Sequence, residues 1–428
     1  MLERTRRPAG WIGIVAAAVL SCQSPPPRES PADPFDALHR LSETIAASAE
    51  VARADEASAV PNGRAEGALH VLRLLRRAID EEIAWADTAH PFFQTQDERF
   101  AKLALGNPDN LYLVTRVDDD AEYVIRGRRG TTADFNVQVY QGYPGIHRPM
   151  RAFGALGLDG LVTDEAGHFE IHVGGPARDG NWIELLPGSR RILVRFTYGD
   201  WATEEAGTLT IERVGERGTR SEPVTDAEAA RRITAAAEYL EDALRGYGAL
   251  VDQVYEGLAP NALRPMRRLT GQTGGLSNQY NATGRYAVDD DTALVVTTRP
   301  SRARYQGFQI GTEWFEALDF VNQTTSLNTR QAQLSSDGVY RFVIATRDPG
   351  VANWLDASSA PQGQILLRWQ GVAEALGPEH EPTVALVPFR ELRRHFPDDE
   401  PVFSAEARRA PIADRQESIE RRYGLFRR

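Results

Sequence analysis

Cysteine and lysine are almost missing from this chain. Cys22 is the only cysteine and Lys102 is the only lysine among 428 residues. A single cysteine near the N-terminus excludes an internal disulfide, a thiolate metal cluster and a catalytic cysteine in the rest of the chain. The fold must therefore be held by its core, and a chain of this length can bury a large one.

Excess positive charge, long apolar runs and catalytic signatures are missing as well. The formal net charge of −11 argues against nucleic acid as a partner, because nucleic-acid-binding domains are basic. No segment after residue 22 is long and apolar enough to cross a membrane. We find no nucleophile-elbow serine motif, zinc-protease motif, P-loop or dinucleotide-binding glycine motif, so the sequence predicts no cofactor.

The first 22 residues have the layout of an export signal. The basic segment Arg4–Arg7 precedes Gly10–Leu20, an apolar segment of signal-peptide length that is too short to span a bilayer comfortably. The signal is expected to occupy 1–22. A polar, proline-rich linker over 23–33 follows it, and such a composition does not build regular structure.

The end of this signal, Val19-Leu20-Ser21-Cys22, resembles the lipobox of bacterial lipoproteins. The resemblance implies that Cys22 carries a diacylglyceryl group and that acyl chains tether the mature protein to a membrane. Gln23 follows the cysteine, which resembles lipoproteins sent to the outer membrane of Gram-negative bacteria. We therefore expect a lipid-anchored protein of the cell envelope. The alternative is an ordinary cleaved signal in which Cys22 is incidental.

An internal duplication organises the rest of the chain. Four pairs of segments match at an offset of 171 to 173 residues: Val117–Asp120 with Val288–Asp291, Gly167–Val173 with Gly338–Ile344, Asn181–Trp182 with Asn353–Trp354, and Leu193–Phe196 with Leu366–Trp369. The offset grows by one residue at a time, between the matched segments. Turns between strands absorb such slips, so the pattern predicts two copies of one β unit.

Apolar and polar residues alternate within each copy, as at Phe169, Ile171 and Val173, and this alternation is typical of half-buried strands. Turn residues separate the short strands and no helical pattern is interleaved, which favours a sandwich or jelly roll. The expected fold is mainly β with flanking α-helices: two antiparallel β-sandwich or jelly-roll units joined by a helical connector. The copies are expected over about Asn107–Gly215 and Gly284–Val372.

Helical patterns surround the two copies. The segment Arg64–Asp87 places five apolar residues on one stripe: Leu69, Leu72, Leu75, Ile79 and Ile83. Thr225–Glu228 looks like a capping box that opens a helix running to about Gly257. The charged tail, Ser404–Arg428, predicts a helix on the surface or a partly frayed one. The expected divisions are 34–100 (N-terminal helical segment), 101–222 (first β-sandwich unit), 223–258 (helical connector), 259–402 (second β-sandwich unit) and 403–428 (tail).

Part of the second copy, Arg347–Asp356 (RDPGVANWLD) followed by Leu366–Trp369 (LLRW), resembles a bacterial family known as domain of unknown function 1214. In the first copy, Gly180–Ile183 (GNWI) and Asn107–Tyr112 (NPDNLY) are similar to the same pattern. The resemblance covers about 101–428 and implies a β-sandwich beside a helical or second β domain. It implies no activity and no catalytic residues.

The repeated Asn, Trp and Arg residues are the first candidate site. In a ligand pocket, the amide would orient the ligand, the ring would stack on it and the guanidinium would pair with an anion. Alternatively, the ring anchors the core, the amide caps a turn and the guanidinium pairs with a carboxylate. The duplication favours this architectural alternative. The candidates are Asn181, Trp182, Arg195, Asn353, Trp354 and Arg368.

A second candidate is a metal site on the strand His168–His172. Residues two apart on a strand face the same way, so His168, Glu170 and His172 share one face, and two imidazoles with a carboxylate suit zinc or iron. The end members are about 13 Å apart along a strand, which favours a solvated strand face instead. The triple-Asp runs at 118–120 and 289–291 lack calcium-loop spacing and predict acidic turns.

Together these patterns favour a non-catalytic, membrane-tethered binding or scaffold protein with a small-molecule or glycan ligand. Two other functions stay open. One is an extracytoplasmic enzyme acting on a small molecule or polysaccharide, with its site between the sandwiches or, metal-assisted, on the His168–His172 face. The other is a structural component of the envelope.

Overall fold

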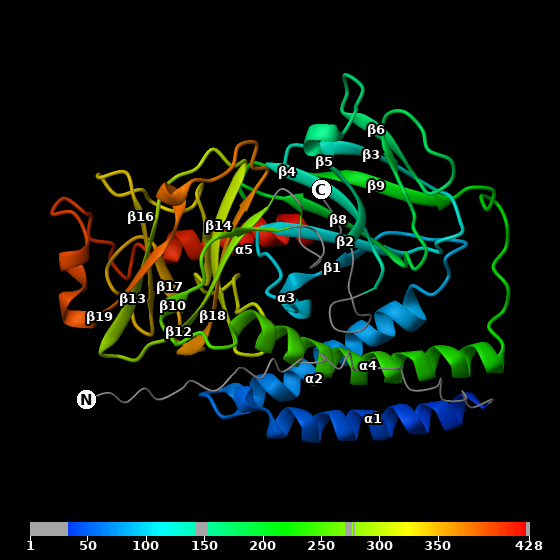
Figure 1. Ribbon diagram of the computed structural model, residues 1–428, viewed down its shortest axis with the longest axis horizontal. Coiled ribbons are helices and arrows are strands. Elements are labelled where there is room, and N and C mark those ends of the chain that lie inside the picture. The colour runs from blue at the N-terminus through cyan, green and yellow to red at the C-terminus, as the bar shows by residue number, and fades with distance from the viewer. Residues whose placement is uncertain (1–32, 143–151, 270–275, 277–278, 425–428) are drawn as a thin grey trace, which may run out of the picture.

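The structure is a computed structural model that describes residues 33–142, 152–269, 276 and 279–424. The expected export signal and Cys22 lie outside these residues. Figure 1 shows two β-sandwich units side by side and a layer of helices that runs along both of them. Along the described ranges, no helix combines the length and the apolarity needed to cross a bilayer.

The first unit consists of two facing sheets. Its strands are β1 (Gln94–Gln96), β2 (Asn110–Arg116), β3 (Tyr123–Gly130), β4 (Asp134–Tyr140), β5 (Ala152–Gly157), β6 (His168–Val173), β7 (Trp182–Ile183), β8 (Arg191–Thr197) and β9 (Ala206–Arg213). One sheet has the order β1-β2-β8-β4-β5 and the other the order β7-β6-β3-β9. A single-turn helix, η3 (Leu158–Gly160), follows β5.

The second unit repeats this plan. Its strands are β10 (Ala262–Leu263), β11 (Arg267–Arg268), β12 (Tyr280–Ala287), β13 (Thr292–Thr298), β14 (Tyr305–Gly311), β15 (Ser326–Asn328), β16 (Tyr340–Ala345), β17 (Trp354–Asp356), β18 (Gln362–Gln370) and β19 (Thr383–Pro388). The sheet orders are β10-β12-β18-β14-β15, with β11 beside β12, and β17-β16-β13-β19. The short helices η4 (Pro378–His380) and η5 (Phe389–His395) flank β19.

The predicted fold class is confirmed. The orders β2-β8-β4-β5 and β12-β18-β14-β15 match strand for strand, and so do the orders of the two partner sheets. The second copy reaches β19 rather than ending at Val372. The repeat pattern did not single out this edge strand, whose only buried residue is Val387, although the expected division 259–402 contains it. Each unit also contains one short parallel pair, β6 with β7 and β16 with β17, where only antiparallel pairing was expected.

Each sandwich has its own apolar core. In the first unit, the rings of Phe135, Phe169 and Phe196 meet between the sheets with centroids 5.1–5.6 Å apart. In the second, Phe308 stacks on Phe342 at 4.7 Å in a core that also buries Trp369 completely. Fully burying one such side chain contributes roughly 1.5–3 kcal/mol, so each unit is held by its own core without disulfides.

Three long helices form the layer beside the sandwiches (Figure 1): α1 (Pro34–Ala54), α2 (Gly63–Ile79) and α4 (Asp226–Tyr255). Side chains cap two of these helices: at the start of α4 Thr225 accepts a hydrogen bond from the Glu228 N–H at 3.2 Å, as expected, and at the start of α1 Asp33 accepts one from the Phe35 N–H at 2.7 Å. Short elements connect them: η1 (Glu56–Ser58), η2 (Asp80–Ala84) and α3 (Glu98–Ala101).

The buried face of α2 differs from the predicted stripe. Leu69 and Leu72 are 45% and 54% exposed, whereas Val71 and Leu74 are buried against α4. Charged groups on the buried face explain the error, since Arg77 lies inside and forms a buried ion pair with Glu81 at 2.7 Å. A pattern based on apolar residues alone cannot anticipate buried ion pairs.

The tail is a helix as expected, with one face buried and most of its other residues exposed. The helix α5 (Arg409–Tyr423) crosses between the two sandwich units (Figure 1). The buried guanidinium of Arg415 donates to the carbonyl oxygens of Phe320 and Ser326 at 2.9 and 2.8 Å. Arg422 lies 4.1 Å from the centre of the Tyr198 ring in the first unit. Arginines whose stems pack on rings let one face of this charged helix be buried.

Candidate functional site

A cleft of about 680 Å³ lies where the helical layer meets the second sandwich. Its walls come from the segment after α1, from α2, from the last turns of α4, from β12 and from the loop after β14. Four of the side chains that line it are buried rings: His70, Tyr247, Tyr255 and Trp314. Small-molecule sites are concavities of about 300–1,000 Å³, so this cleft has the size of one.

The rings hold one another in place. His70 lies against Trp314 with ring centres 5.2 Å apart, and meets Tyr247 edge-on at 6.1 Å. The indole N–H of Trp314 donates to the carbonyl of Gly63 at 2.9 Å. An added Cβ at Gly67 would lie 2.5 Å from the Trp314 ring, so the glycine lets the ring pack closely on α2. The aromatic wall is therefore preformed.

A buried carboxylate fixes the imidazole of His70. Glu316 has no exposed surface, and its Oε1 lies 2.7 Å from Nδ1 of His70. Its other oxygen forms an ion pair with Arg73, which also pairs with Glu66 at 2.9 Å. Among the described residues, Nε2 of His70 makes no hydrogen bond. The imidazole is thus oriented from behind by the carboxylate.

The backbone beside Glu316 is strained. Phe315 has φ of 57°, and it meets a second segment in which Lys102, Ala104 and Leu105 have φ of 54°, 57° and 46°. The two segments are joined by hydrogen bonds from Leu105 N–H to the Phe315 carbonyl and from Ala317 N–H to the Lys102 carbonyl, both at 2.9 Å. Each such residue costs roughly 1–3 kcal/mol, and strain of this kind persists where a site is held in one geometry.

Tyr255 contributes an unsatisfied polar group. It is 4% exposed, and its hydroxyl has no hydrogen-bond partner among the residues that the structure describes. Burial raises the pKa of this hydroxyl above its usual range, so it is neutral. Buried hydroxyls are nearly always paired, which makes an orphan hydroxyl in the wall of a cleft a candidate ligand contact.

Gly248 keeps the cleft open. It lies in the interior of α4, where glycine costs roughly 0.5–1 kcal/mol relative to alanine. An added Cβ at this position would meet no atom within 4 Å. No packing contact therefore requires a glycine here, and a larger side chain would project into the open space of the cleft.

The structure does not bring the repeated Asn, Trp and Arg residues together. The amide of Asn181 bonds to the backbone of Val162, and Asn353 bonds in the same way to the backbone of Gln333, at 2.7–2.8 Å. The indole N–H groups of Trp182 and Trp354 donate to carbonyl oxygens at equivalent positions, Gly174 and Ala345. These contacts favour the architectural alternative for both pairs.

The repeated arginines lie on the sheets opposite these pairs. Arg195 donates to Gln138 at 2.9 Å and to the Tyr140 hydroxyl at 2.7 Å. Arg368 donates to the equivalent Gln309 and also to the carbonyl of the strained Leu105. Arg195 orders the outer face of one sheet. Arg368 holds the strained backbone at Leu105 against β18. Neither has a hydrogen bond or ring contact with the Asn-Trp pair of its own unit.

The metal candidate is not assembled. His168 turns to Asp164 at 3.2 Å, and Nε2 of His172 lies 3.0 Å from Glu170, which also pairs with Arg126. Across the described ranges, no group of three or more His, Cys, Asp or Glu residues is arranged to hold a metal ion. This face carries a shallow, open depression of about 500 Å³, which offers less enclosure than the cleft.

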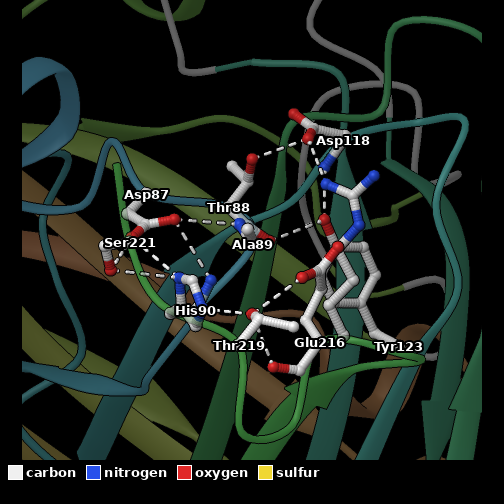
Figure 2. A network of polar contacts seen from close by, with 10 residues as sticks. Asp87, Thr88, Ala89, His90, Asp118, Tyr123, Glu216, Thr219 and Ser221 are labelled. Atoms are coloured by element: carbon white, nitrogen blue, oxygen red, sulfur yellow. Dashed lines mark hydrogen bonds and ion pairs between the residues drawn. The ribbon is translucent and has the colours of Figure 1, made fainter. Parts of the chain in front are cut away.

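A second polar network fastens the connector between β9 and α4 (Figure 2). Nδ1 of His90 lies 3.1 Å from Asp87, and its Nε2 lies 2.8 Å from the Thr219 hydroxyl. This order of carboxylate, imidazole and hydroxyl is that of hydrolase triads. However, the Thr219 hydroxyl donates to the Glu216 carbonyl at 2.8 Å, and the His90 and Asp87 side chains are 31% and 42% exposed. We therefore assign the network to holding the connector in place.

Sequence patterns missed the cleft because its parts are far apart in the chain. His70 and Glu316 are separated by 246 residues, and His70 stands alone in the sequence without ligand spacing. Gly67 and Gly248, inside otherwise helical segments, were a usable signal, because a glycine in a helix interior often marks a close approach or a functional constraint.

Comparison with known proteins supports the fold and indicates no activity. No family model matches the sequence, and no curated protein matches it. An uncharacterised protein from Burkholderia cenocepacia is similar in structure, with 29% identity, 83% of this chain and 97% of that chain covered, and a TM-score of 0.76. The VPA0106 protein from Vibrio parahaemolyticus has 12% identity, with 81% of this chain and 99% of that chain covered, and a TM-score of 0.42. The resemblance to domain of unknown function 1214 stays a prediction.

Proposed function

We propose that this chain is a ligand-binding lipoprotein of the cell envelope whose small-molecule ligand binds in the cleft between the helical layer and the second sandwich. The observation that carries the proposal is the cleft itself, which has a volume of about 680 Å³ and buried rings in its wall. Among the described residues the Tyr255 hydroxyl in this wall has no hydrogen-bond partner, and Gly248 leaves open space beside α4. A preformed aromatic wall loses little entropy on binding, which favours recognition of a small ligand.

The pair of His70 and Glu316 supports the enzyme alternative, since an imidazole oriented by a carboxylate is a recurrent general base. A binding role is favoured for two reasons. The described lining contains no Ser, Thr, Cys or Lys, and Trp314 and Tyr247 both pack against the His70 ring. A glycan ligand on the first sandwich finds less support, because the depression there is shallow.

A fragment screen by saturation-transfer NMR tests the proposal. We expect the wild type to bind a set of fragments that Gly248→Phe no longer binds, because the ring of the variant occupies the cleft. Gly248→Ala is the matched control. It adds only a Cβ into open space, so it should keep the fragments and stabilise the protein by roughly 0.5–1 kcal/mol. Identical fragment sets for the wild type and Gly248→Phe would refute the cleft as the binding site.

The membrane anchor predicts a separate result. Cys22→Ser should move the protein from the membrane fraction to the soluble fraction, because stable anchoring requires acyl chains and this is the only cysteine able to carry them. Immunoblots of fractionated cells report the outcome, with Ser24→Ala as a control that keeps the cysteine. A Cys22→Ser protein that remains in the membrane fraction after a high-salt wash would contradict lipid anchoring.

A further inference from the structure

We infer that the cleft recognises an organic cation, namely an amine or quaternary ammonium group with apolar substituents. The inference rests on the proposed function, in that it assumes a small molecule enters the cleft. It goes beyond it by naming the charge and the class of that molecule. Two features of the walls carry the argument: their charge and their rings.

The charged groups of the cleft are mostly acidic. Five carboxylates line it against one guanidinium, that of Arg285: Asp55, Glu56, Asp252, Glu256 and Glu313. Arg285 is committed to Glu313 at 3.0 Å. The other four carboxylates form no ion pair among the described residues, and Glu56, Asp252 and Glu256 are exposed at the rim. Carboxylates of one sign around a concave surface attract cations.

Nearby positive charge does not cancel this field inside the cleft. Arg264 donates to the carbonyls of Val254 and Glu256, both at 2.6 Å, but it is not part of the cleft wall. It caps the end of α4, whose last turn contains no basic residue. An anionic ligand would therefore meet one guanidinium that is already paired and several carboxylates that repel it.

The aromatic wall suits the same ligand. A cation within about 6 Å of an aromatic ring is attracted by the electron-rich face of the ring, most strongly by tryptophan and then by tyrosine. Trp314, Tyr247 and Tyr255 all line the cleft. The neutral hydroxyl of Tyr255, which lacks a partner, offers its oxygen as an acceptor to an ammonium N–H. Carboxylates at the rim and rings in the wall together favour a cation with apolar substituents.

A matched pair of probes tests charge without changing shape. Choline and 3,3-dimethylbutan-1-ol differ in one atom, the quaternary nitrogen of the first being a carbon in the second. By isothermal titration calorimetry on the purified full chain, choline should bind at least about tenfold more tightly than the alcohol, and this preference should shrink as salt rises. Equal affinity for the two probes, or tighter binding of the alcohol, would overturn the inference.

Removing the rim charge gives the second test. The triple variant Glu56→Gln, Asp252→Asn, Glu256→Gln should weaken choline binding about tenfold and leave binding of the alcohol unchanged. The control changes three exposed carboxylates outside the cleft, Glu374→Gln, Asp398→Asn and Glu406→Gln, and so keeps the same net charge as the test variant. Equal affinities for choline in the two triple variants would refute a role for the rim.

The failure of this inference is distinguishable from failure of the proposed function. If neutral or anionic fragments bind the wild type and are lost in Gly248→Phe while choline does not bind, the cleft is a ligand site and the cation assignment is wrong. If neither choline nor any fragment shows binding that depends on Gly248, both are wrong.

Discussion

Replacing Glu316 with alanine should lower the free energy of unfolding by about 3–5 kcal/mol, because it removes one partner of a buried ion pair. Glu316 is fully buried and satisfies both the imidazole of His70 and the guanidinium of Arg73. The variant leaves Arg73, whose side chain is 14% exposed, with only Glu66 as a partner. It also removes the contact that orients the wall of the cleft, so ligand affinity should fall together with stability.

Urea denaturation followed by circular dichroism measures this change. The matched control is Glu66→Ala, which removes the other partner of Arg73. The Glu66 side chain is 31% exposed, so its pair with Arg73 is screened and its loss should cost about 0–1 kcal/mol. If Glu316→Ala and Glu66→Ala lower the free energy of unfolding by the same small amount, the buried carboxylate of Glu316 does not hold the strained backbone at Phe315 in place.

Replacing Glu98 with glutamine should make the protein more stable at alkaline pH. Burial raises the pKa of Glu98 from 4.5 to about 7. Its Oε1 accepts a hydrogen bond from Gln96 at 2.5 Å, while its Oε2 has no partner among the described residues. Arg77 and Arg368 pull the pKa down, but the loss of water outweighs them.

The sign of the pH dependence follows from where the proton is held. Between pH 4.5 and 7 the folded protein keeps the Glu98 proton and the unfolded chain releases it. The stabilisation that Glu98 provides is therefore complete below pH 4.5 and is lost as pH rises through 7. Glutamine cannot ionise, so the stability difference between Glu98→Gln and the wild type should grow by about 2–3 kcal/mol from about pH 5 to about pH 8.5.

Denaturation curves at several pH values test this prediction. Glu406→Gln, at an exposed position, is the control, and its stability difference from the wild type should not change over the same range. A flat difference for Glu98→Gln as well would mean that Glu98 ionises normally in the folded protein.

The fold was readable from the sequence because each copy repeats the same local pattern. Alternation at Phe169, Ile171 and Val173 fixes which face of β6 is buried, and the matching residues of β16 are buried too, although Val343 and Ala345 on its other face are also covered. Two copies with the same spacing of turns and apolar residues indicate the same arrangement of strands in each copy. Local patterns say less about residues whose partners are distant in the chain: the edge strand β19 buries only Val387, and the buried face of α5 includes Arg415 and Arg422.

The candidate site was not readable in the same way. The predicted Asn181–Trp182 and Asn353–Trp354 pairs are conspicuous because they repeat, and they repeat because each sandwich uses them to fasten its own loops. The cleft occurs once. It depends on a contact between His70 and Glu316 across 246 residues and on a left-handed φ at Phe315. Neither feature leaves a local signature, and the buried ion pairs of α2 reverse the face that its leucines predict.

The most direct test of the account is a crystal structure of the protein soaked with the strongest fragment found by NMR. The account predicts that the fragment lies in the cleft, in contact with Trp314 and Tyr255, and that it is absent from crystals of Gly248→Phe. A fragment bound on the outer face of β3, β6 and β9, or between the two sandwiches, with the cleft empty, would contradict it.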